Sequence, residues 1–93
     1  MTENEITEIL KASSVDSRIK IIKLIRDRKL CVNAIARNLE ITQSAVSQHL
    51  KVLKDCNLVF SERYGSIIHY QLNKEKIEEF LNGLSNLLTD SQK

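Results

Sequence analysis

Residues 43–56 place uncharged hydrogen-bonding side chains where a surface helix usually carries charges. At about 100° per residue, the polar face of this stretch consists of Gln43, Ser44, Ser47, Gln48, Lys51, Lys54 and Asp55. The apolar face consists of Ala45, Val46, His49, Leu50, Val52, Leu53 and Cys56. Gln can bond adenine twice and Ser can donate to or accept from several bases. The pattern predicts a recognition helix whose first turns enter the major groove of DNA.

An uncharged solvent-facing helix is the alternative interpretation of the same pattern. Two observations favour DNA. No carboxylate, which would repel phosphate, comes before Asp55 on the polar face, and a helix N-terminus favours a nearby phosphate.

Cysteine and histidine supply the other reactive groups. Cys31 precedes a predicted helix, where a thiolate would be stabilised, and Cys56 ends the predicted recognition helix. A thiol switch at Cys31 and Cys56 is one hypothesis, and two small buried apolar side chains are the more ordinary one. We expect His49 to be a packed, hydrogen-bonded residue. We expect His69 to face solvent or to pack beside Tyr70.

The composition of the 93 residues, with a net charge of +2, predicts one soluble domain over residues 1–93. No apolar run approaches the ~20 residues of a membrane span, and the acidic start is unlike a signal peptide, so a cytoplasmic location is expected. There is no Ser/His/Asp constellation, phosphate-binding loop or pair of buried carboxylates. The sequence therefore predicts neither an enzyme nor a cofactor.

Four helices are predicted before any hairpin. They cover residues 3–12, a stretch capped by Ser14 or Asp16 and ending near Arg28, residues 33–39, and residues 43–55 with Thr42 as N-cap. Apolar residues surround most of the second helix, which predicts a central position; they are Val15, Ile19, Ile21, Ile22, Leu24 and Ile25. Leu30–Val32 is expected to be a brief extended link or small strand.

A hairpin and a final helix complete the chain. Val, Phe, Ile and Tyr flank Tyr64-Gly65-Ser66, which predicts a β-hairpin. Asn73 can cap a helix from Lys74 to about Leu88. Its apolar residues have heptad-like spacing; they are Ile77, Leu81, Leu84 and Leu88. The predicted fold is mainly α with a small hairpin, in the order α-α-α-α-β-β-α, which is the plan of a winged helix-turn-helix.

The chain resembles the ArsR/SmtB family of winged-helix repressors. The resemblance covers LCV before the first helix of the motif, TQSAVSQHLKVLKD, NLV and the hairpin ending IIHYQL. It implies a homodimer formed by the first and last helices, which binds double-stranded operator DNA. The implied DNA-binding residues are Gln43, Ser44, Ser47, Gln48 and Lys51, with Arg63, Tyr64 and Ser66 in the wing. The predicted dimer seam combines Ile6, Ile9 and Leu10 with Ile77, Leu81, Leu84 and Leu88. The alternative is that these residues pack in the core of one subunit.

The chain departs from the family pattern at its turns and metal sites. Glu40 stands where the turn of the motif usually has Gly, and Asn57 replaces another Gly. One known metal site uses a CxC motif, but here that stretch is Cys31-Val32-Asn33; the other needs Asp/His pairs on the last helix, which has no His. We therefore expect neither usual metal site.

These observations predict a dimeric, sequence-specific transcriptional regulator, a repressor that reads an imperfect palindrome. The alternative is a winged-helix protein-interaction module within a larger assembly.

Overall fold

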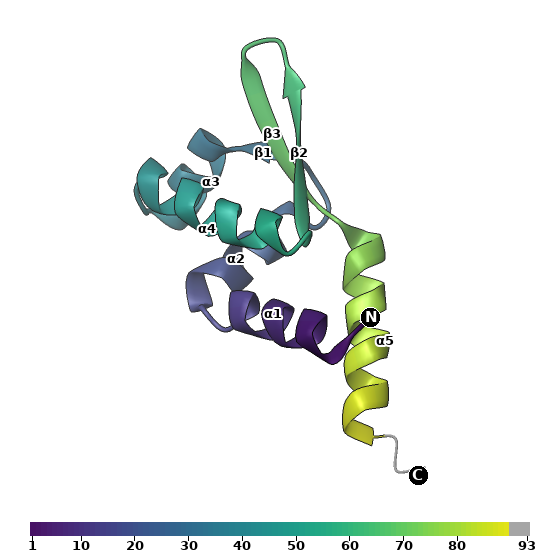
Figure 1. The fold of residues 1–93 in the computed structure, drawn as a ribbon. Coiled ribbons are helices and arrows are strands. Elements are labelled where there is room, and N and C mark those ends of the chain that lie inside the picture. The colour runs from purple at the N-terminus through teal and green to yellow at the C-terminus, as the bar shows by residue number, and fades with distance from the viewer. Residues whose placement is uncertain (90–93) are drawn as a thin grey trace.

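The computed structural model describes residues 1–89, in which five helices and three strands follow the predicted order. These elements are α1 (Glu3–Ser13), α2 (Asp16–Ile25), β1 (Leu30–Cys31), α3 (Val32–Leu39), α4 (Gln43–Asp55), β2 (Val59–Tyr64), β3 (Ile67–Leu72) and α5 (Lys74–Thr89). The hairpin projects at one end of a body 52 Å long, and α5 extends at the other end (Figure 1). None of the helices within residues 1–89 is long and apolar enough to cross a membrane. The predicted winged helix-turn-helix is confirmed.

Side-chain caps define where three helices begin. Thr2 and Glu5 form a capping box at the start of α1, in which each side chain accepts from the backbone N–H of the other, at 3.1 and 2.8 Å. Thr42 caps α4 through the Ala45 N–H at 3.1 Å, as predicted. Asn73 caps α5 through the N–H of Lys76 at 3.2 Å, also as predicted. Side-chain oxygens thus satisfy N–H groups that a helix start leaves unpaired.

The boundaries predicted for α2 are wrong at both ends. Val15, rather than Ser14 or Asp16, is the N-cap, and it makes no side-chain hydrogen bond. The hydroxyl of Ser14 instead donates to the carbonyl of Lys11 at the end of α1. The helix ends at Ile25, three residues before Arg28. The intervening charged residues form the bend that returns the chain to β1.

The core lies where α1, α2, α3 and α4 meet, closed by the start of β2 and by α5. Its buried apolar residues are Ile6, Ile9, Ala12, Ile21, Ile25, Ile35, Ala36, Val46, Leu50, Leu53, Leu58, Val59 and Phe80. The predicted central position of α2 holds only in part. Ile21 and Ile25 are fully buried, but Ile19 lies on the opposite side and is 41% exposed.

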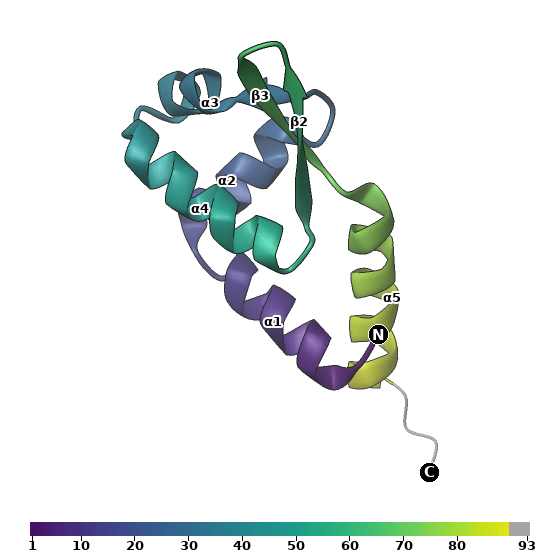
Figure 2. The same cartoon turned by 45° about the horizontal axis from the view of Figure 1, so that its top comes forward.

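A three-stranded antiparallel sheet of order β1-β3-β2 forms the wing. The link near Leu30 is a two-residue strand paired with Tyr70 and His69, and α3 begins one residue earlier than predicted, at Val32. The predicted turn is confirmed, with Gly65 at φ +65°, a conformation that costs glycine little. Figure 2 shows the wing rising beside α4 and the start of α5 leaving from its base.

Two non-glycine residues adopt the left-handed conformation, Glu40 at φ 57° and Asn57 at φ 66°. Both stand where the family usually has Gly, and each follows the last residues of a helix of the motif. At Glu40, the backbone N–H still reaches the carbonyl of Ala36, so the turn keeps its bond. The Cβ of Glu40 is the source of strain, whereas Asn tolerates this region better.

We expect Glu40→Gly to raise the free energy of unfolding by about 1 kcal/mol, because glycine removes the steric cost of the left-handed conformation. Urea denaturation measures this directly. Asn57→Gly is the matched control and should gain less. A loss of stability in Glu40→Gly would contradict the strain assigned to this residue.

Candidate nucleic-acid interface

Helix α4 presents the predicted polar face to solvent and its apolar face to the core. Val46, Leu50 and Leu53 are fully buried, whereas the outward residues are all exposed. The exposed residues of the predicted DNA-binding set are Gln43, Ser44, Ser47, Gln48 and Lys51 on α4, with Arg63, Tyr64 and Ser66 in the wing. Helix α3, the turn at Glu40 and α4 thus form a helix-turn-helix whose second helix has one free side.

Charge on the exposed face of α4 increases toward its C-terminus. Lys51 pairs with Asp55 at 3.2 Å, and both side chains are largely exposed, so the pair is weak and Lys51 can exchange it for a phosphate. Lys54 donates to the hydroxyl of Ser61 on β2 at 3.0 Å, which ties the end of α4 to the wing. The first two turns keep an uncharged surface of amides and hydroxyls.

The predicted DNA-binding residues on β2 lie on two different faces of the sheet. Alternation along β2 places Arg63 on the same side as Ser61, which contacts α4. Tyr64 lies on the other side with Glu62, to which its hydroxyl donates at 2.7 Å. Only Arg63 therefore shares the α4 side of the sheet.

Tyr64 is held in a cluster that the sequence did not indicate. The Lys29 ammonium donates to the Tyr64 hydroxyl and lies 4.5 Å from the centre of its ring. The hydrogen bond to Tyr64 raises the pKa of Lys29. Lys29 and Tyr64 are 35 residues apart, so the pair exists only once the loop after α2 reaches the wing.

Arg18 and His49 connect α4 to the helices beneath it. The Arg18 Nε donates to His49 Nδ1 at 3.2 Å, and its Nη1 donates to the carbonyl of Ala12 at 3.2 Å. A packed, hydrogen-bonded His49 was predicted and is confirmed; its partner, 31 residues away, was not foreseen. Burial, and then the Arg18 charge, lowers the pKa of His49.

The environment of His69 differs from the prediction. Its ring meets Tyr64 edge-on, with centroids 5.2 Å apart, and it does not share a face with Tyr70. Consecutive residues of a strand point to opposite faces, so His69 and Tyr70 are separated by the sheet.

Both cysteines are free and half-buried. Cys31 is the N-cap of α3, and Cys56 is the C-cap of α4, where its thiol contacts the carbonyl of Leu53 at 3.5 Å. Burial raises the pKa of Cys56, which disfavours the reactive thiolate there. A thiol switch at Cys31 and Cys56 stays a prediction.

Side chains that could bind a metal ion are dispersed through residues 1–89. No three His, Cys, Asp or Glu side chains in this part of the chain gather where they could hold a metal ion.

The predicted dimer seam separates into buried and exposed residues. Ile6 and Ile9 belong to the core of the single chain, which corrects their assignment to a free face. Ile77 and Leu84 are half-buried. The exposed apolar residues of α1, α5 and the N-terminus are Met1, Leu10, Leu81, Leu87 and Leu88. Gly83 lets the two helices approach, since a Cβ there would lie 3.2 Å from the Ile6 side chain.

Together, the wing, the helix-turn-helix and the exposed polar face of α4 define a DNA-binding protein of the winged-helix class. The sequence model of the bacterial regulatory protein family arsR matches residues 16–61. The arsenical resistance operon repressor of Staphylococcus aureus is 30% identical over the whole of this chain, which spans 89% of that protein. The chain therefore belongs to the arsR family, whose members are transcriptional regulators and not enzymes.

Solved structures show the same fold. The ArsR-like transcriptional regulator from Rhodococcus sp. RHA1 has a TM-score of 0.84 at 23% identity, covering 90% of this chain and 79% of that one. HlyU from Vibrio cholerae, a transcriptional activator, has a TM-score of 0.76 at 29% identity, covering 95% and 98%.

The lowered pKa of His49 predicts that stability falls in mild acid. Between the ordinary value of 6.5 and the lower folded value, the unfolded chain binds more protons, so acid favours unfolding in this window. Thermal unfolding followed from about pH 7 to about pH 5 should show a smaller loss of stability in His49→Gln than in the unsubstituted protein.

Arg18→Gln is the companion variant, because removing this charge should bring the pKa of His49 back toward its ordinary value. An identical pH dependence in His49→Gln and the unsubstituted protein would contradict the assignment.

Proposed function

We propose that the protein is a dimeric repressor that binds an imperfect palindromic operator in the cytoplasm, where it competes with RNA polymerase for the promoter. The observation that carries the proposal is the exposed, uncharged N-terminal half of α4, held outward by the fully buried Val46 and Leu50. Short side chains there can approach base edges without bringing a negative charge to the phosphates.

The side chains divide into two roles on DNA. Gln43, Ser44, Ser47 and Gln48 read bases, since amides and hydroxyls match the donors and acceptors of the major groove. Lys51 and Arg63 bind phosphate, and Ser66 at the wing tip contacts the backbone or minor groove. Tyr64 is bonded to Lys29 and Glu62, so its contribution to DNA is to fix the shape of the wing.

The apolar surface of α1 and α5 supports dimerisation. Leu81 is 55% exposed and Leu88 72% exposed, and both lie on the helix that also carries the half-buried Leu84. Burying such side chains against a second copy is favourable by roughly 1.5–3 kcal/mol for each one fully covered. A two-fold dimer places its recognition helices one helical turn of DNA apart, about 34–36 Å.

A protein-interaction module is not favoured as an alternative. The exposed face of α4 has no aromatic or aliphatic anchor of the kind that dominates protein–protein binding. Its amides and hydroxyls fit base edges better.

Substitution of Gln48 should change which sequences are bound. Selection of duplexes from a random pool should recover inverted repeats, with half-sites about 10 base pairs apart. We expect Gln48→Ala to lose about 1–3 kcal/mol on the selected site and to relax preference at one position of each half-site. Fluorescence anisotropy on the selected site and on single-base variants measures both effects.

Lys51→Ala is the matched control on the same helix face. It should weaken all duplexes similarly and reduce the slope of log affinity against log salt by about 1. Equal losses on every sequence for both variants would leave only nonspecific attraction and would refute base reading by Gln48.

Substitution of Leu81 should separate the two subunits. We expect Leu81→Glu to halve the molar mass measured by light scattering, because a buried unpaired carboxylate opposes pairing. Ile67→Glu is the matched control, since Ile67 is 50% exposed but lies at the wing tip, far from α5. A monomeric parent protein, or a dimeric Leu81→Glu, would exclude this seam.

A further inference from the structure

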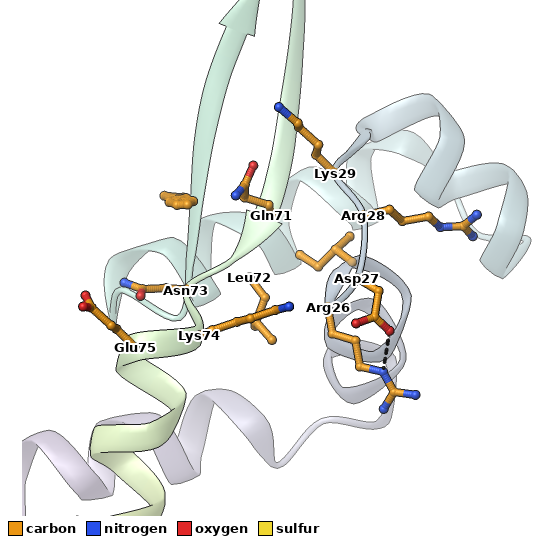
Figure 3. Close-up of a pocket in the computed structure, with 11 residues that line it drawn as sticks. Arg26, Asp27, Arg28, Lys29, Gln71, Leu72, Asn73, Lys74 and Glu75 are labelled. Carbon is orange, nitrogen blue, oxygen red and sulfur yellow. Dashed lines mark hydrogen bonds and ion pairs between the residues drawn. The ribbon is translucent and has the colours of Figure 1, made fainter.

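A cleft at the base of the wing is unused by the proposed DNA interface. It lies between the α2–β1 loop, the lower part of β2 and β3, and the start of α5, with a volume of about 520 Å³ (Figure 3). This volume is within the range of small-molecule sites. Its walls come from three segments that are distant in the sequence.

Positive charge dominates the rim of the cleft. The lining contains four cationic residues, Arg26, Arg28, Lys29 and Lys74, and two acidic ones, Asp27 and Glu75. The side chains of Arg28 and Glu75 extend away from the cleft (Figure 3), and Lys29 pairs with Glu62 of β2 at 3.9 Å. Arg26 bonds Asp27 at 3.4 Å. Lys74 extends from α5 across the cleft toward the loop (Figure 3) and has no ion-pair partner within residues 1–89. Lys74 therefore brings a positive charge into the cleft that an anion would offset.

Apolar and amide groups lie beneath these charges. Phe60 is 38% exposed, and it pairs across the sheet with Gln71. Both residues line the cleft, as does Leu72. Gln71 lies beside the cleft (Figure 3), and its side-chain amide makes no hydrogen bond within residues 1–89. An apolar ligand body could cover Phe60 while a polar end bonds Gln71.

The cleft opens on the side of the sheet away from α4. Ser61 meets Lys54 of α4, so its neighbour Phe60 points to the opposite face. A ligand in the cleft would therefore leave the recognition helix free. It would also contact the loop that holds the wing, since Lys29 lines the cleft and bonds Tyr64 at the wing tip.

We propose that this cleft binds a small organic anion, a carboxylate with an apolar or aromatic body. Lys74 meets the carboxylate, Gln71 donates a further hydrogen bond, and Phe60 packs on the apolar body. Charge-assisted bonds of this kind are the strong ones in such a site. Binding of the anion does not depend on the proposed function. An effect of the bound anion on operator binding would depend on it.

The test is an amide-detected NMR titration of the full chain without DNA. The probes are a panel of aromatic and aliphatic monocarboxylates, each with its neutral amide, and inorganic phosphate. We expect at least one carboxylate to shift the backbone signals of Gln71 and Lys74 saturably, and its amide to bind at least about tenfold more weakly. Lys74→Gln should lower the affinity about tenfold.

Lys20→Gln removes the same charge at an exposed position of α2 that does not line the cleft, and it should bind normally. Thermal unfolding verifies that both variants are folded. The proposal is overturned if no carboxylate saturates the cleft signals, if Lys74→Gln binds as tightly as the parent, or if phosphate binds as tightly as the best carboxylate. Because DNA is absent, failure here is distinguishable from failure of operator binding.

Discussion

Burial of one side of α4 is the constraint on which the rest of the structure depends. Val46, Leu50 and Leu53 are fully enclosed, so the helix cannot rotate without exposing them. Each such side chain is worth about 1.5–3 kcal/mol when buried. Rotation by half a turn would cost all three and would replace the amides and hydroxyls at the surface with leucine and valine. The outward direction of Gln48 is therefore a consequence of core packing.

Polar contacts then limit how far α4 can shift along the core surface against which it packs. Arg18 of α2 donates to His49 in the middle of α4 and to the carbonyl of Ala12 on α1, and Lys54 at the end of α4 donates to Ser61 of the wing. These contacts join α4 both to the helices below and to the wing above. The two DNA-binding elements of one chain are thereby positioned relative to each other, although they belong to different layers of the fold.

The two ends of the chain complete a core that a domain of 93 residues can only partly build by itself. Helix α5 contributes Phe80 to that core, and Gly83 lets it approach Ile6 closely. The same helix leaves leucines on its outer side. A second copy that covers them would also set the spacing between two recognition helices, so stability and site spacing would come from one surface.

Local signals in the sequence determined the element order, the caps at Thr42 and Asn73, the two faces of α4 and the turn at Gly65. Such features depend on periodicity and on neighbours within a few residues. Only the tertiary structure decided the partners of His49 and Tyr64, the core position of Ile6 and Ile9, and the cleft at the wing base. Each of these joins residues that are far apart in the chain, and an apolar pattern marks a face for burial without stating what will bury it.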